Sequence, residues 1–204
     1  MRSSTLRTIV IGVTILIALI MGIQVYWVSK TYKLEEKEFN IKVNSALRAV
    51  VEAIRFSHKD TAPFAGVITQ TGPDYFIADT KYLADSNQAD FLLKKAIEEY
   101  SVFTSFKYGI YNAPEDRLSH VTFVTSGQYG GDPGTPLPLI RKPYNYIGVL
   151  FPNREQFIIH QMGFWIFSTF FLLVVIIGFA VSIFKLFRQK QLSEIQKDFI
   201  NNMT

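Results

Sequence analysis

Two long stretches without a charged residue constrain the fold of this chain more than any other feature. Residues 8–29 form a run of 22 uncharged residues, and residues 156–184 form a run of 29. About 20 apolar residues suffice for a helix to cross the roughly 30 Å hydrocarbon layer of a membrane. We therefore predict two transmembrane helices, at residues 8–29 and 161–184, with residues 30–160 forming one small domain between them.

The charged residues predict the orientation of these helices. Residues 30–160 hold 15 basic and 15 acidic side chains, so the net charge of +4 lies outside this segment. Lys and Arg collect on the cytoplasmic side of membrane helices. This bias predicts a multi-pass protein of the inner membrane, with residues 1–7 and 185–204 in the cytoplasm and residues 30–160 in the periplasm. Basic residues confined to the membrane flanks argue against nucleic acid as a partner.

The first apolar run is predicted to be a retained anchor. It is longer than the core of a signal peptide, which has about 7 to 15 residues, and no small-residue cleavage site follows it. Tyr26, Trp27 and Trp165 lie near the predicted outer ends of the two runs, where aromatic rings favour the lipid headgroup level. The sequence contains no cysteine, which excludes disulfides and thiolate metal sites.

The segment after the first run has the pattern of a long helix. Val43, Leu47, Val50 and Ile54 recur at helical spacing, and neither Gly nor Pro occurs between residues 30 and 62. Such spacing is typical of a helix with one buried face. We predict a single helix from the membrane to about Ser57. A break near Ser29 followed by a separate helix is the alternative.

A second helix and several strands are predicted further along. The N-cap candidates of this helix are Asp85, Ser86 and Asn87. Alternating or β-branched and aromatic residues predict strands at residues 67–68, 75–77, 106–111, 121–123 and 144–151. The Gly- and Pro-rich segment 127–138 is expected to be a flexible hairpin tip or a ligand-facing loop. These elements predict an α+β domain, with a long N-terminal helix, an antiparallel sheet and one further helix, which resembles PAS-like sensor domains.

The end of the chain is predicted to be one long helix. Asn153 can cap it, and Gln156 completes a capping box. No proline occurs from residue 153 to Thr204. The helix is expected to cross the membrane and to continue into the cytoplasm as a rod of about 50 residues, roughly 75 Å long at 1.5 Å per residue.

The tail of the chain carries its most specific motif. Residues 198–204 read Asp-Phe-Ile-Asn-Asn-Met-Thr and resemble the lead-in to the phospho-acceptor box of sensor histidine kinases, in which His-Glu follows a final Ser or Thr. The box positions are matched by Phe199, Asn201, Asn202 and Thr204. Similarity to the linker and external domain of kinases of the Bacteroidetes type extends to residues 106–111, 147–153 and 188–195.

The resemblance implies the sensory half of a homodimeric two-component kinase, which detects an external ligand, uses ATP and Mg²⁺, and phosphorylates a response regulator. The acceptor histidine is expected immediately after Thr204. No residue of this chain is therefore expected to be catalytic or to bind a cofactor or metal, and the chain alone is expected to be inactive. Phe199 follows Lys185 by only 14 positions, too few for a HAMP relay, so the second membrane helix is expected to drive the acceptor helix directly.

Other interpretations rest on fewer residues. His58 with Asp60, or His120, could ligate a metal, but isolated histidines are more often surface or core residues. The many aromatic residues fit a sheet core or, as the alternative, an apolar ligand pocket. Two other functions stay open: a non-enzymatic, chemoreceptor-like input module that signals to a separate protein, and a two-span structural or assembly protein.

Overall fold

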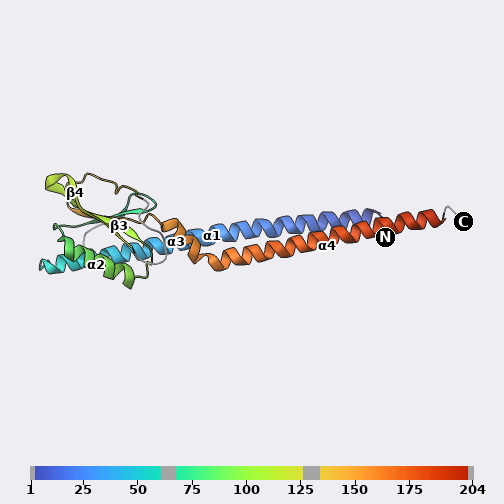
Figure 1. The fold of residues 1–204 in the computed structure, drawn as a ribbon, viewed down its shortest axis with the longest axis horizontal. Coiled ribbons are helices and arrows are strands. Elements are labelled where there is room, and N and C mark those ends of the chain that lie inside the picture. The colour runs from blue at the N-terminus through green and yellow to red at the C-terminus, as the bar shows by residue number, and fades with distance from the viewer. Residues whose placement is uncertain (1–2, 61–67, 126–133, 202–204) are drawn as a thin grey trace. The chain divides into compact units, whose positions relative to one another are not determined.

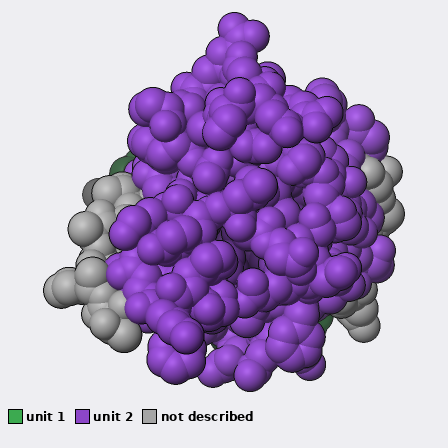
Figure 2. Space-filling model, turned by 90° about the vertical axis from the view of Figure 1, so that its left-hand side faces the viewer, with its two compact units in different colours: residues 1–31, 162–204 green, residues 32–161 purple. Residues whose placement is uncertain are grey.

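The computed structural model describes residues 3–60, 68–125 and 134–201. Those ranges contain four α-helices, one 3₁₀-helix and five strands (Figure 1). The chain divides into two units, coloured separately in Figure 2. Unit 1 consists of Met1–Thr31 and Met162–Thr204, and unit 2 of Tyr32–Gln161.

The first helix, α1 (Ser3–Ser57), contributes to both units. Its N-terminal part includes the first uncharged run and is long and apolar enough to cross a membrane. Its C-terminal part buries Val43, Leu47, Val50 and Ile54, each of which is at most 1% exposed. The prediction of one helix to Ser57 is therefore confirmed, and the alternative break near Ser29 does not occur.

Helix α2 (Ser86–Glu99) begins where the sequence offered three capping candidates. Asp85 is the residue used, because its Oδ2 accepts hydrogen bonds from the backbone N–H groups of Asn87 and Gln88, both at 3.1 Å. These bonds satisfy two donors that have no partner within the helix. The helix buries Leu93 and Ile97 together with two alanines.

The sheet of unit 2 is antiparallel throughout, in the order β1-β2-β5-β3-β4. Its strands are β1 (Ile68–Gln70), β2 (Tyr75–Asp79), β3 (Phe106–Asn112), β4 (Arg117–Val124) and β5 (Tyr146–Leu150), and the 3₁₀-helix η1 (Ala113–Glu115) connects β3 to β4. The last strand in the sequence is thus the central strand of the sheet. The prediction of an α+β fold with an antiparallel sheet is confirmed.

The two faces of the sheet have different covers. Helices α1 and α2 lie along one face (Figure 1), where Phe76 of β2 and Phe151 beyond β5 contact Phe39 of α1. Side chains alternate between the two faces of a strand. The opposite face therefore carries a second buried cluster, which consists of Tyr75, Ile77, Tyr111, Tyr146 and Leu150.

The largest differences in strand length between prediction and structure occur at β4 and β5. Strand β4 begins at Arg117, whereas only residues 121–123 were expected. The pairing between β3 and β4 shifts between Tyr108 and Ile110, and His120 has a positive φ of 49°. Such an irregularity interrupts the alternation of side chains between the two faces of a strand. The alternating sequence pattern by which a strand is predicted is therefore lost around Ser119 and His120. Strand β5 is shorter than the predicted strand 144–151.

The prediction of one helix from residue 153 to Thr204 is wrong at one point. Helix α3 (Arg154–Gln161) ends before Met162, and α4 (Gly163–Asn201) begins after it. Met162 is nearly buried and its carbonyl accepts a hydrogen bond from the N–H of Ile166, which starts the new helix. Gly163 lowers the helix propensity at this position. The helix is therefore easily interrupted here, at the point where the packed helix α3 ends. Helix α4 itself runs without interruption.

Asp90 of α2 connects this helix to the sheet and predicts a dependence of stability on pH. Its Oδ2 accepts from Lys94 Nζ at 2.6 Å, and its Oδ1 accepts from the hydroxyl of Tyr108 on β3 at 3.0 Å. The bond from Lys94 lowers the pKa of Asp90; burial opposes this shift, and the Tyr108 bond adds to it. A carboxylate with a lowered pKa stabilises the fold at pH values above its pKa in the unfolded chain, about 3.9. This contribution is lost as the pH falls through its pKa in the folded chain.

We therefore expect Asp90→Asn to cost about 1 kcal/mol of unfolding free energy at pH 7, and the difference from wild type to shrink below about pH 4. Thermal unfolding of the full chain at pH 7 and pH 3, followed by near-ultraviolet circular dichroism, measures both. Asp74→Asn, the same substitution at another aspartate of unit 2, is the matched control. An equal difference at both pH values would contradict the prediction.

Candidate functional site

The central strand of the sheet leads directly into helix α3. Three residues separate the end of β5 from Arg154, the first residue of α3. Phe151 is tied to the sheet because its N–H donates to the carbonyl of Asp74 at 2.8 Å, and its own carbonyl accepts from the N–H of Arg154 at 3.1 Å. These two hydrogen bonds connect the sheet to the start of α3.

Arg154 attaches α3 to α1. Its guanidinium Nη2 lies 2.8 Å from Glu36 Oε1 and 3.4 Å from Asn40 Oδ1, and its Cζ lies 5.5 Å from the ring centre of Phe39. We call these three residues of α1 the α3 seat. The Arg154 side chain is 3% exposed, and a cation in the first turn of a helix is unfavourable beside the helix dipole. The α3 seat supplies the compensating charge.

The attachment leaves one polar atom unsatisfied. Arg154 Nε is buried and has no hydrogen-bond partner among the described residues. A buried donor without a partner costs about 1–3 kcal/mol. Release of α3 from the seat would relieve this cost, so the docked position is less stable than a fully satisfied ion pair would make it.

Phe39 connects three parts of unit 2. Its ring centre lies 5.4 Å from that of Phe151 and 6.5 Å from that of Phe76, both on the sheet side, and 5.7 Å from that of Phe157 on α3. Aromatic pairs at these separations contribute about 0.5–1.5 kcal/mol beyond burial of area. The ring therefore couples the position of α3 to both α1 and the sheet.

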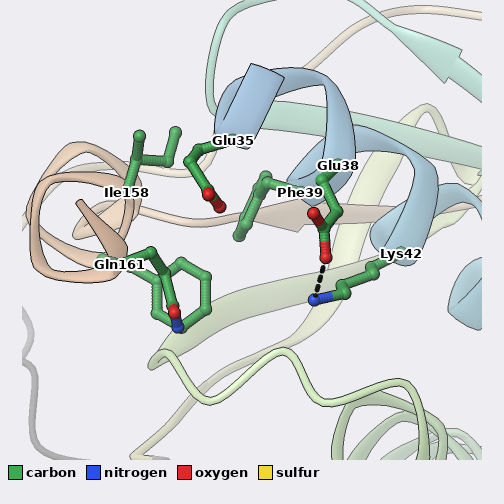
Figure 3. Close-up of a pocket in the computed structure, with 7 residues that line it drawn as sticks. Glu35, Glu38, Phe39, Lys42, Ile158 and Gln161 are labelled. Atoms are coloured by element: carbon green, nitrogen blue, oxygen red, sulfur yellow. Dashed lines mark ion pairs between the residues drawn. The ribbon is translucent and has the colours of Figure 1, made fainter. Parts of the chain in front are cut away.

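A cavity of about 170 Å³ opens between α1 and α3 beside this ring (Figure 3). It is lined by Glu35, Glu38, Phe39, Lys42, Phe157, Ile158 and Gln161. Glu38 and Lys42 form an ion pair of 2.8 Å along α1, which Figure 3 marks with a dashed line. On this side α3 therefore does not fill the space against α1.

The opposite face of the sheet carries a second candidate surface. The segment 134–145 crosses this face, and Leu137 and Ile140 pack on its tyrosine cluster. The Tyr75 hydroxyl donates to the carbonyl of Pro138 at 3.0 Å, and the N–H of Ile140 donates to the Tyr146 hydroxyl at 3.1 Å. Burial, and secondarily the neighbouring Tyr146, raises the pKa of Tyr75, so its hydroxyl stays protonated and able to donate.

Two paired glycines allow this close cover. Gly109 of β3 lies opposite Gly148 of β5. A Cβ at Gly148 would lie 2.2 Å from the Tyr75 hydroxyl oxygen, and one at Gly109 would lie 2.6 Å from Leu137 Cδ2. The tyrosine and the leucine therefore occupy the space above the backbone of the two strands. Any ligand of this face would have to displace them.

The end of segment 134–145 is fixed by charge. Lys142 Nζ lies 3.1 Å from Asp79 Oδ1, and both side chains are at most 20% exposed. Burial disfavours the charge on Lys142, but the hydrogen bonds with Tyr144 and Asp79 outweigh it and raise the pKa of the lysine. The pair attaches this segment to the end of β2.

The residues singled out from the sequence lie elsewhere. Phe199 and Asn201 belong to α4, whereas Asn202 and Thr204 lie outside the described residues, as do residues 127–133 of the predicted loop. His58 stacks on Tyr82 at 4.4 Å, and its Nδ1 lies 2.9 Å from the carbonyl of Ile54. His120 lies on β4, with its ring centre 6.0 Å from that of Tyr108. No group of three or more metal-binding side chains occurs among the described residues.

Sequence reasoning missed the α3 seat. Glu36 and Arg154 are 118 positions apart, and nothing in their local patterns relates one to the other. The signal that could have found them is the charge of Arg154 itself, because this arginine follows the apolar strand residues 146–151 closely, and a buried arginine needs a partner.

Comparison with known proteins gives one similarity. No protein-family model matches the chain, and no solved structure matches it. The chain is 35% identical over 80 residues to "Sensor protein RprX" of Bacteroides fragilis (strain YCH46). The matched stretch covers 39% of this chain and only 14% of RprX. This similarity, together with two helices apolar enough to cross a membrane, supports a membrane-associated sensor protein.

Proposed function

We propose that this chain is the sensing and transmembrane-signalling part of a two-component sensor histidine kinase. A PAS-like domain in the periplasm would detect an external cue, and the two apolar helices would span the inner membrane. One observation carries the proposal: the central strand β5 continues through α3 into α4, and the uninterrupted helix α4 ends in the sequence that resembles an acceptor-box lead-in. The similarity to a protein named as a sensor supports it.

The α3 seat is the proposed point of transmission. Helix α1 would be the fixed element, and α3 the moving one, because α3 follows the central strand and is attached mainly by Arg154 and Phe157. Two positions of α3 would place α4 in two orientations. Packed elements of this kind switch between discrete states. In a homodimer, the change in α4 would alter the packing of the two acceptor helices.

The phosphate chemistry is assigned to residues beyond this chain. We propose that the acceptor histidine follows Thr204 and that ATP and Mg²⁺ bind in a further catalytic domain, which phosphorylates a cognate response regulator. No step of that reaction is assigned to the described residues.

An insertion series tests direct coupling through α4. The chain is joined at Thr204 to the acceptor and catalytic domains of a characterised sensor kinase, and one to seven alanines are inserted after Gln191. Each residue turns a helix by about 100°, so we expect autophosphorylation to change with the first insertions and to return near its starting level with seven. Substituting the acceptor histidine by Gln is the control and should abolish labelling.

The outcomes separate the candidate functions. A periodic dependence on insertion length supports a kinase driven directly by α4. A level that does not depend on insertion length contradicts direct coupling. A continuation after Thr204 that encodes no His-Glu box would instead favour the chemoreceptor-like input module.

A further inference from the structure

Gln24 is a polar residue within the outer part of an apolar helix segment. It lies in α1 six positions before Lys30, the first charged residue after the run 8–29. Six residues correspond to about 9 Å of helix, so in a membrane of about 30 Å hydrocarbon thickness its amide would lie within the apolar layer. Trp27, one turn further outward, stacks on Trp165 with ring centres 6.5 Å apart, as expected of rings near the headgroup level.

Within unit 1, Gln24 uses only part of its hydrogen-bonding capacity. Its Nε2 donates to Thr169 Oγ1 at 2.7 Å, and the Thr169 hydroxyl in turn donates to the carbonyl of Trp165 at 2.8 Å. A primary amide has two N–H donors and one carbonyl acceptor. The described residues provide no partner for the carbonyl Oε1 or for the second N–H. In hydrocarbon each unsatisfied group costs several kcal/mol.

The surroundings of Gln24 leave space for side chains of a neighbouring helix. A groove of about 240 Å³ lies between α1 and α4 of unit 1, which run side by side (Figure 1). It is lined by Met21, Gln24, Val25, Val28, Ser29, Thr169, Leu172, Leu173 and Ile176. The α1 residues 21, 24, 25 and 28 form one stripe of the helix, because they are spaced by three and four. The groove is thus apolar apart from three short polar groups, one of which is the incomplete amide.

We propose that the Gln24 side chains of two copies of this chain hydrogen-bond to each other in the membrane. A primary amide complements itself, because each carbonyl can accept an N–H from the other amide about a two-fold axis. The lipid chains offer no hydrogen-bond donor, so they cannot satisfy Oε1. A second copy supplies both missing groups at the same depth. The inference rests on the proposed function, because it specifies the membrane contact of the proposed homodimer.

The pairing assigns distinct roles to the two polar residues. Thr169 occupies one N–H of Gln24 and so orients the amide within its own chain. The remaining N–H and the carbonyl are then directed to the partner. Loss of Gln24 should weaken the dimer, whereas loss of the Thr169 hydroxyl should leave the amide able to pair between chains.

Dimerisation of the full 204-residue chain tests the inference. Donor- and acceptor-labelled copies are reconstituted in phosphatidylcholine bicelles, and energy transfer is measured as lipid is added. Two interhelical hydrogen bonds of the strength measured in membranes predict that Gln24→Leu weakens dimerisation about tenfold. Thr169→Val should weaken it less than twofold. Thr14→Val, a polar position on α1 that lines another groove, is the matched control and should have no effect.

Each outcome decides the inference. A selective loss with Gln24→Leu supports it. Equal losses with Gln24→Leu and Thr169→Val would show that the amide acts within one chain, and an unaffected dimer would show that the contact lies elsewhere; both overturn the inference but leave the homodimer intact. A wild-type chain that stays monomeric in bicelles would overturn both the inference and the proposed homodimer. The insertion series with the joined kinase tests the direct coupling separately.

Discussion

Glu36→Ala is expected to lower the free energy of unfolding of unit 2 by about 2–4 kcal/mol, because it leaves the buried guanidinium of Arg154 without its carboxylate partner. The Arg154 side chain is 3% exposed, and Glu36 is its only carboxylate partner among the described residues. What remains is Asn40 at 3.4 Å and the ring of Phe39. Breaking a buried ion pair costs about 3–5 kcal/mol, and the lower range applies here because Glu36 itself is 37% exposed.

Glu38→Ala is the matched control for this prediction. Glu38 lies two positions away on the same helix and also forms an ion pair, but its side chain and that of Lys42 are 53% and 36% exposed. An exposed pair at this spacing contributes about 0.3–0.5 kcal/mol, and the helix propensity of the substitution is the same. The difference in lost unfolding free energy between the two variants therefore reports the effect of burying the cationic partner, Arg154 rather than Lys42.

Hydrogen exchange of the full chain in lipid nanodiscs measures the effect where it should occur. With Glu36→Ala, peptides that cover α3 are expected to exchange faster than in wild type, because α3 leaves its seat more often. Peptides that cover α2 should change less. Urea unfolding followed by near-ultraviolet circular dichroism gives the free energy. Equal effects of Glu36→Ala and Glu38→Ala would show that Arg154 does not depend on its carboxylate partner.

The second large effect is expected from Gly148→Ala, at about 1–3 kcal/mol of lost stability. The added Cβ would lie 2.2 Å from the Tyr75 hydroxyl oxygen and 3.0 Å from its Cζ. Tyr75 cannot move away at little cost, because the residue is 3% exposed and its hydroxyl donates a hydrogen bond to the carbonyl of Pro138. The substitution therefore opposes the cover of the sheet by segment 134–145.

A second substitution makes this prediction specific. Tyr75→Phe removes the oxygen that the new Cβ would meet, so Gly148→Ala combined with Tyr75→Phe is expected to cost less than the sum of the two single changes. Gly72→Ala is the control, since its Cβ would meet no atom closer than 3.6 Å. Thermal unfolding of all four variants measures the coupling. Strictly additive losses would mean that the Tyr75 hydroxyl does not cause the strain.

Local patterns predicted much of the fold from the sequence. The predictions of α1, α2 and β3 used an apolar stripe, capping residues and an alternating pattern, respectively. These signals involve residues only two to four positions apart, and all three elements occur in the structure. The two apolar runs were also predicted from local sequence, because a helix that crosses a membrane needs one uninterrupted stretch of about 20 apolar residues. Where the alternation is broken, as at Ser119 and His120, the prediction of β4 was too short.

The break at Met162 shows where local reasoning stops. The sequence from residue 153 onward lacks proline and has helical composition, so a continuous helix was the expected structure. Gly163 weakens the helix by only about 1 kcal/mol relative to alanine, which does not by itself break it. Arg154 and Phe157 dock α3 on α1 within unit 2, and the helix is interrupted at Met162, where α3 ends and α4 has not yet begun.

The sequence by itself determined which segments are helices, which are strands and which are apolar enough to enter a membrane. These properties follow from neighbouring residues, through periodicity and length. Only the tertiary structure decided that β5 occupies the centre of the sheet, that Arg154 meets Glu36, and that Tyr75 lies over Gly148. Such contacts join residues 35 to 118 positions apart, and their partners are selected by packing and by the cost of burying an unpaired charge, which no local pattern records.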